Sequence, residues 1–137
     1  MASLYTIPPT TADVVKKLRF ASARANNPES QIFEIDRTSH AIVPQAPGDK
    51  FQTIDDLADA LPPNSPRYIL LSYPMTRADG RKSSPFVMLY YLPETATQQA
   101  KMLYAGAVEI FRSAAGVSQL IEIEEDEDLQ TIADQIR

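Results

Sequence analysis

The sequence predicts a single α/β domain in which a mixed β-sheet lies between helices. Two nearly continuous apolar runs, residues 67–73 and 85–92, have the pattern of central strands that are covered on both faces. An apolar stripe at helical spacing over residues 96–115 indicates a long helix that packs on this sheet. A chain of 137 residues has the length of one domain with one hydrophobic core.

The first expected element is an amphipathic helix that starts near residue 10. Thr10 or Thr11 precedes the helical pattern and can accept a hydrogen bond from an amide of the first turn. Val14 or Val15, together with Leu18, forms the expected inner stripe. The outer face carries a cluster that we call the N-terminal basic patch: Lys16, Lys17, Arg19 and Arg24.

A hairpin and a short helix are expected next. Residues 31–36 alternate apolar and polar side chains as a half-buried strand does, and residues 41–43 are the expected partner strand. His40 would then lie in the turn between them as a solvated residue. Thr53 can cap a short helix that ends at the pair Pro62-Pro63.

The second half of the chain is expected to contain the two central strands, the long helix, a further strand and a final helix. The central strands are joined by a polar segment that we call the hairpin loop, with Arg77, Asp79, Arg81 and Lys82. Thr95 or Thr97 can cap the helix over residues 96–115, and Gly116 can close it. Residues 119–123 are the further strand, and apolar residues at 129, 132, 133 and 136 mark the last helix.

The two faces of the expected long helix differ. One stripe should lie on the sheet: Ala96, Ala100, Leu103, Ala107, Ile110 and Ala114. The opposite face combines small residues, a methionine and two cations: Lys101, Met102, Ala105, Gly106, Val108 and Arg112. A helix that meets only water would carry long charged side chains there, so this face predicts a flat surface onto which another protein docks. The alternative is that Met102 packs on a neighbouring loop and the small residues have no function.

Composition argues against catalysis. The chain has no cysteine, one histidine and no phosphate-binding glycine loop, so we expect no enzyme, no cofactor and no metal site. The acidic run from Glu124 to Asp128 lacks the ligand spacing and the internal glycine of an EF-hand loop. Negative charge at a helix N-terminus is the better explanation of that run.

Charge and hydropathy limit the partners. The net charge is −5, but seven of the 18 acidic residues follow residue 121, where Arg137 is the one basic residue. The first 121 residues therefore carry 12 basic and 11 acidic side chains, a balance that argues against nucleic-acid binding. No run approaches the ~20 apolar residues of a membrane span, and no secretory signal is visible, so we expect a protein that stays inside the cell and off membranes.

Several segments resemble one known family. They are Val15 to Phe20, Ile35-Asp36, Pro66-Arg67-Tyr68, Ser72-Tyr73, Asp79-Gly80-Arg81, Leu92-Pro93 and Gln98 to Gly106. Together they resemble the actin-depolymerising factor homology family, the ADF/cofilin-like proteins, over nearly the whole chain. Lys-Met-x-Tyr-Ala at residues 101–105 is shared with cofilins, which would also place lysines where residues 109–111 stand here. Gln98-Gln99, Ala105-Gly106 and the Asp-Gly-Arg loop look most like the glia maturation factors, although Ala107 and Val108 depart from their vertebrate members.

The resemblance implies a single domain over residues 1–137 that binds the actin-related protein 2/3 complex, inhibits branched actin nucleation and dissociates existing branches. It implies that the N-terminus joins the docking face, and we call the combined set the docking surface: Ser3, Leu4, Tyr5, Lys101, Met102, Ala105, Gly106, Val108 and Arg112. The hairpin loop and the N-terminal basic patch would form a second surface. Related proteins also suggest phosphorylation of an N-terminal serine such as Ser3.

The expected partner subunit is actin-related protein 2, with actin as a further contact at the branch junction and the protein itself a monomer. The expected location is the cytoplasm at sites of branched actin, including cortical patches, with the nucleus as an alternative. Two other functions stay open. One is cofilin-like binding and severing of actin, and the other is a small enzyme of unknown type, for which no residue gives positive support.

Overall fold

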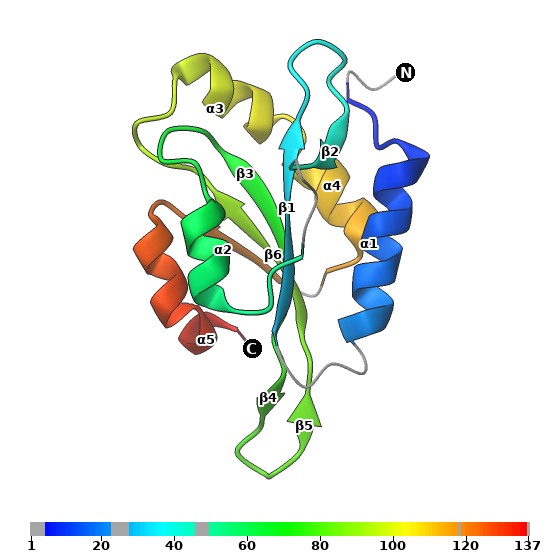
Figure 1. The fold of residues 1–137 in the computed structure, drawn as a ribbon, viewed down its shortest axis with the longest axis vertical. Helices are drawn as coiled ribbons and strands as arrows, with labels where there is room; N and C mark the ends of the chain where they lie inside the picture. Colours follow the sequence, from blue (N-terminus) through cyan, green and yellow to red (C-terminus); the bar gives the residue numbers. More distant parts are fainter. Residues whose placement is uncertain (1–4, 23–27, 46–49, 118, 137) are drawn as a thin grey trace.

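The computed structural model describes residues 5–22, 28–45, 50–117 and 119–136. A five-stranded sheet lies at its centre, in the order β2-β1-β3-β6-β7 (Figure 1). The strands are β1 Glu29–Ile35, β2 Ile42–Pro44, β3 Arg67–Ser72, β6 Phe86–Tyr91 and β7 Gln119–Ile123. β7 runs parallel to β6, and the other neighbouring strands pair antiparallel. The predicted mixed sheet and the predicted hairpin of β1 and β2 are confirmed.

Helices cover both faces of this sheet, with α1 and α4 on one side and α2 and α5 on the other (Figure 1). The helices are α1 Pro9–Ser22, α2 Ile54–Ala60, α3 Gln98–Ala105, α4 Val108–Ala115, the 3-10 helix η1 Asp126–Thr131 and α5 Ile132–Gln135. In β3, Tyr68 and Leu70 pack in the core beneath α1 and α4, whereas Ile69 and Leu71 pack beneath α2 and α5. Burial of both faces is the reason that this strand is a continuous apolar run.

Helix α1 starts earlier than the threonines predicted. Pro9 is its first residue, where the missing amide proton costs nothing because a first-turn amide has no partner within the helix. Thr11 is fully buried and does not cap the helix; its hydroxyl donates a hydrogen bond of 2.8 Å to the carbonyl of Ile42 in β2. The predicted inner stripe is confirmed, since Val15 and Leu18 are buried.

Several predicted helix ends are confirmed. The amide of Asp56 donates to the Thr53 hydroxyl at the start of α2, at 3.1 Å. The amide of Ala100 donates to the Thr97 hydroxyl at the start of α3, also at 3.1 Å. Gly116 closes α4 in the left-handed region, with φ 68°. At the C-terminal end, Glu125 and Asp128 form a reciprocal capping box at η1, so the acidic run does begin a helix.

The expected single helix over residues 96–115 is wrong, because it is divided into α3 and α4. At the division the amide of Ala107 donates to the carbonyl of Tyr104, three residues back, at 3.2 Å, which tightens the chain into a turn. The stripe of α4 that faces the core is therefore Val108, Phe111 and Ala115. Ala107 is buried as predicted, but after it the core-facing positions are displaced by one residue, since the predicted Ile110 and Ala114 are exposed.

The hairpin loop is a small β-hairpin of β4 Met75–Thr76 and β5 Lys82–Ser83, which turns at Gly80 with φ 89°. It protrudes from the end of the molecule opposite α3 (Figure 1). In the part of the chain that the structure describes, no helix combines the length and the apolarity needed to cross a membrane.

Candidate docking surface

The N-terminal segment lies directly against the C-terminal end of α3. The hydroxyl of Tyr5 donates a hydrogen bond of 2.8 Å to the carbonyl of Leu103. A Cβ atom at residue 106 would overlap the Tyr5 hydroxyl and approach the ring, so Gly106 is the residue that permits this contact. The N-terminal segment is also attached to β2, because the carbonyl of Thr6 accepts a hydrogen bond from the amide of Ile42 at 2.9 Å. The structure thus brings Tyr5 and α3 together, as the docking surface requires.

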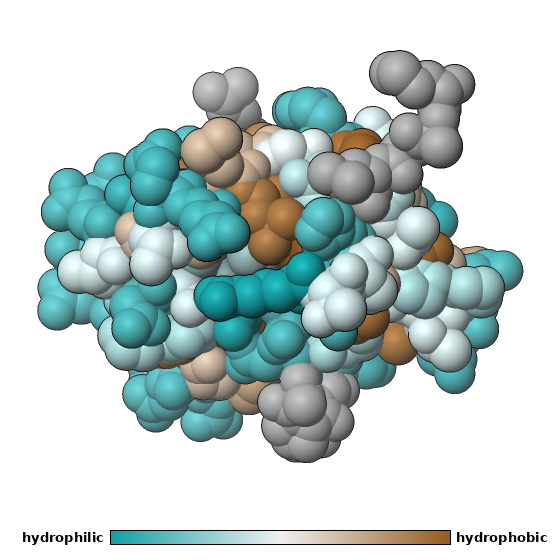
Figure 2. Space-filling model, turned by 90° about the horizontal axis from the view of Figure 1, so that it is seen from above, coloured by the Kyte–Doolittle hydropathy of each residue, from teal (hydrophilic) through white to brown (hydrophobic). Residues whose placement is uncertain are grey.

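Met102 is the exposed apolar side chain of this surface. Its side chain lies on α3 and the residue is 65% exposed, so the alternative in which Met102 packs on a neighbouring loop is wrong. Ala105 and Gly106 are also exposed, and Lys101 is half-buried beside them. Figure 2 shows this end of the molecule from above, with small apolar patches enclosed by hydrophilic side chains. A single exposed methionine among small residues suits insertion into a groove of a partner.

Two members of the predicted docking surface have other environments. Val108 is only 8% exposed and packs in the core, because the division of the helix turns it inward; its prediction as a contact residue is therefore wrong. Arg112 is half-buried, and its guanidinium lies 3.5 Å from the carboxylate of Glu109. An ion pair of this kind at the surface contributes about 0–1 kcal/mol to the unfolding free energy. Ser3 and Leu4 lie outside the described residues.

Tyr104 fixes α3 to the sheet, a role that the sequence motif alone did not reveal. Its hydroxyl accepts hydrogen bonds from the amide of Ile35 at 3.0 Å and from the Arg67 guanidinium at 3.3 Å. Its carbonyl accepts a hydrogen bond from the hydroxyl of Tyr68. Burial raises the pKa of Tyr104, so the hydroxyl stays neutral. These bonds hold the exposed face of α3 on a rigid support.

The members of the N-terminal basic patch differ in whether they bond to the rest of the domain. Lys16 and Lys17 are exposed on α1, as predicted. Arg19 is exposed too, but it also donates a hydrogen bond of 3.1 Å to the carbonyl of Ala115, so it caps the last turn of α4, where positive charge is favourable. Arg24 lies outside the described residues.

Three of the four charged residues of the hairpin loop make contacts within the hairpin. Arg81 and Asp79 form an exposed ion pair of 2.7 Å, and the guanidinium of Arg77 donates to the hydroxyl of Ser83 at 2.8 Å. Lys82 is exposed. As predicted, this loop lies far from α3 (Figure 1), so it belongs to a surface separate from the docking surface.

His40 is not the solvated turn residue that was expected. It lies in the β1–β2 turn with a left-handed backbone, φ 59°, but it is half-buried and its ring centre is 5.8 Å from that of Tyr5. Among the described residues, no three histidine or acidic side chains converge closely enough to hold a metal ion.

Comparison with known proteins places the chain in a family. Residues 4–137 match the family described as Cofilin/tropomyosin-type actin-binding protein. Protein AIM7 of Saccharomyces cerevisiae is 36% identical over 146 aligned residues, covering 99% of this chain and 98% of that protein. Human glia maturation factor beta is 31% identical over 118 residues, covering 85% of this chain and 82% of that protein.

The chain belongs to the glia maturation factor branch of the actin-depolymerising factor homology family. A solved structure supports the same assignment: the glia maturation factor of Caenorhabditis elegans superposes with a TM-score of 0.79 at 28% identity, covering 99% of this chain and all of that one. Cofilin of Streptomyces griseoflavus shares the fold, with a TM-score of 0.77 at 16% identity. The predicted resemblance is confirmed, and the description of the matched family is that of actin-binding proteins.

Proposed function

We propose that this protein binds the actin-related protein 2/3 complex through α3 and the N-terminal segment, inhibits branched actin nucleation and dissociates existing branches. The observation that supports the proposal is the exposed Met102 on a helix that Tyr104 fixes to the sheet and that Tyr5 flanks. The similarity to proteins named glia maturation factor also supports the proposal.

The surface suits a groove of an actin-like subunit, for which we propose actin-related protein 2. Met102 would insert its side chain, while Ala105 and Gly106 let the partner's backbone approach and Lys101 meets acidic groups at the rim. Because α3 is already fixed by hydrogen bonds, docking would lose little conformational entropy. A preformed helix face also explains how one small domain can bind without rearranging its own core.

Debranching requires more than occupation of one groove. We propose that the β4–β5 hairpin acts on a neighbouring filament subunit, since it protrudes from the end of the molecule opposite α3 (Figure 1). Lys82, which makes no ion pair among the described residues, is its free cation. The two contacts would then lie on separate ends of the domain, so that one can hold the complex while the other displaces the daughter filament.

Cofilin-like binding and severing of actin is the second candidate, because the Lys-Met-x-Tyr-Ala motif of α3 is shared with cofilins. Against it, Glu109 and Ile110 are exposed on α4, where a cofilin would carry lysines for the filament. An acidic and an apolar side chain at these positions disfavour contact with the acidic surface of actin.

Two binding experiments separate the candidates. The protein should be retained by purified actin-related protein 2/3 complex on beads, and it should sediment poorly with pure actin filaments. Strong sedimentation with filaments and no retention by the complex would show that the cofilin-like function is the correct one.

In cells we propose the cytoplasm at branched actin, such as cortical patches, as the site of action, which a fluorescent fusion would reveal.

A further inference from the structure

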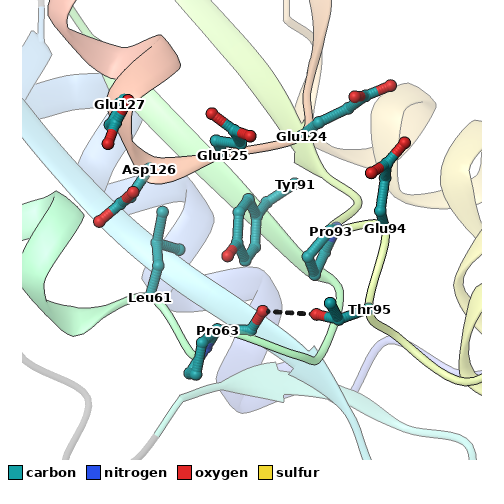
Figure 3. Close-up of a pocket in the computed structure, with 10 residues that line it drawn as sticks. All are labelled: Leu61, Pro63, Tyr91, Pro93, Glu94, Thr95, Glu124, Glu125, Asp126 and Glu127. Carbon is teal, nitrogen blue, oxygen red and sulfur yellow. Dashed lines mark hydrogen bonds between the residues drawn. The ribbon is translucent and has the colours of Figure 1, made fainter.

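Two pockets on the described surface differ in the charge of their lining. One lies on the α2 and η1 side, and carboxylates surround it, among them those of Glu94, Glu124 and Glu127 (Figure 3). The other has a volume of about 140 Å³ and lies between the β1–β2 turn and α3; we call it the Arg37 pocket. The residues that line it are Arg37, His40, Thr97, Gln99, Ala100 and Leu103. They include a cation and no carboxylate, so this pocket favours a negatively charged occupant.

The polar side chains of the Arg37 pocket can all donate hydrogen bonds. The guanidinium of Arg37 carries donors only, and the ring of His40 donates through at least one nitrogen. The hydroxyl of Thr97 already accepts a hydrogen bond from the amide of Ala100 at 3.1 Å, so its own proton is left to donate. The side-chain amide of Gln99 has two further protons. An occupant that accepts several hydrogen bonds therefore matches this lining.

Arg37 and Gln99 are available for such an occupant. Both are exposed, and neither side chain makes an ion pair or a hydrogen bond with another described residue. The neighbouring carboxylates are engaged elsewhere. That of Asp36 accepts two hydrogen bonds from amides of the turn, at 2.8 and 3.0 Å, and that of Glu34 lies 3.9 Å from the guanidinium of Arg67. The cation of the pocket is thus left for an external anion.

The turn that carries Arg37 is fixed at His40. The amide of His40 donates a hydrogen bond of 2.8 Å to the carbonyl of Asp36, and its carbonyl accepts one of 3.2 Å from the amide of Thr6. The half-buried ring lies with its centre 5.8 Å from that of Tyr5. The pocket is therefore formed before any partner binds, which lowers the conformational entropy that binding costs.

The Arg37 pocket adjoins the docking surface. Leu103 lines the pocket, and its carbonyl accepts the hydrogen bond from Tyr5. Gln99 lies three residues before Met102, so the two side chains are neighbours on α3. A partner that covers Met102 can therefore also reach the pocket. Its volume equals that of about four to five waters at roughly 30 Å³ each, which is enough for the carboxylate end of an acidic side chain.

We propose that the Arg37 pocket binds a carboxylate side chain of the partner that docks on α3, an inference that rests on the proposed function. The planar guanidinium of Arg37 binds the two carboxylate oxygens, because its donors match their geometry. The Thr97 hydroxyl and the Gln99 amide add neutral donors. The pocket thereby selects a partner with an acidic residue at the edge of its groove.

The first test uses the full chain labelled with ¹⁵N and a capped tripeptide, acetyl-Gly-Glu-Gly-amide. We expect saturable shifts in the amides of residues 37–40 and 97–103, and none with the glutamine peptide, which has the same shape without the charge. Arg37→Gln should weaken binding about 2- to 5-fold, as for the loss of one exposed ion pair. The matched control is Lys50→Gln, which removes the same charge from an exposed position outside the pocket and should leave the affinity unchanged. No saturable shift, equal shifts with the glutamine peptide, or equal weakening by the control would overturn the inference.

The second test measures the affinity for purified actin-related protein 2/3 complex. Arg37→Gln should weaken this binding about 2- to 5-fold, whereas Lys50→Gln should not change it. If the unmodified protein and Arg37→Gln bind the complex equally well, the inference is overturned and the proposed function stands. If the unmodified protein does not bind the complex, the proposed function is overturned, and saturable shifts with the glutamate peptide would still support a carboxylate site at Arg37.

Discussion

The contact between Tyr5 and Gly106 makes a sharp prediction about the docking surface. In Gly106→Ala the new methyl group would overlap the Tyr5 hydroxyl, so the tyrosine must turn away and lose its bond to the Leu103 carbonyl. That loss costs about 0.5–1.5 kcal/mol of unfolding free energy. The helical backbone at residue 106, with φ −69°, accepts alanine. Alanine also leaves the unfolded chain fewer conformations than glycine does, which raises the unfolding free energy by about 0.4–1 kcal/mol. The two effects nearly cancel.

Because the net change is small, the decisive quantity is the coupling between the two residues. Tyr5→Phe removes the hydroxyl and should cost about 0.5–1.5 kcal/mol in the unmodified protein. In the Gly106→Ala background the bond is already broken and the overlap is relieved, so the same change should cost nothing or stabilise the protein. Urea denaturation of the four proteins gives the coupling energy, expected at about 0.5–1.5 kcal/mol.

Gly80→Ala provides the control for this cycle. Gly80 lies in the β4–β5 hairpin, and nothing surrounds it within 4 Å, so its substitution acts only through the backbone. Combined with Tyr5→Phe, it should be additive within about 0.5 kcal/mol, as for distant sites. If Tyr5→Phe costs the same with glycine or alanine at residue 106, the packing of the N-terminal segment on α3 is refuted.

The other predictions concern binding, debranching and pH. Lys101→Ala with Met102→Ala should weaken binding of the actin-related protein 2/3 complex by about 1–3 kcal/mol, and it should leave the melting temperature nearly unchanged because Met102 is exposed. Unaltered affinity in a binding titration would show that this face is not used. Lys16→Glu with Lys17→Glu should slow association and reduce its salt dependence in stopped-flow measurements, and wild-type rates would mean that the lysines are only solvated. Arg81→Ala with Lys82→Ala should bind the complex normally yet remove branches more slowly in single-filament imaging, and equal debranching at saturation would exclude the hairpin from function. Burial raises the pKa of Tyr90 to about 12, whereas the same hydroxyl has a pKa near 10 in the unfolded chain. Between these pH values the hydroxyl ionises in the unfolded chain alone, which stabilises the unfolded state. Unfolding free energy should therefore fall between pH 10 and 12, by up to about 2.7 kcal/mol for this residue, and Tyr90→Phe should reduce that loss in urea titrations at each pH.

The sequence by itself determined the elements whose signals are local. Thr53 and Thr97 cap their helices and Gly116 closes α4, because each acts on amides or carbonyls within a few residues. The central strands β3 and β6 were visible because burial of both faces leaves an uninterrupted apolar run. The sequence also placed Met102 on the face of α3 that points away from the sheet, whereas the structure decided that no loop covers it.

Only the tertiary structure decided where the long helix divides and what its residues contact. Helical periodicity assumes one continuous phase, so a one-residue displacement after Ala107 turned Val108 from the predicted surface into the core. The hydrogen bond from Tyr5 to Leu103 and that from Arg19 to Ala115 join residues more than ninety positions apart. A local pattern carries no information about such partners, because it records the side of an element that is apolar and not the element that packs against it.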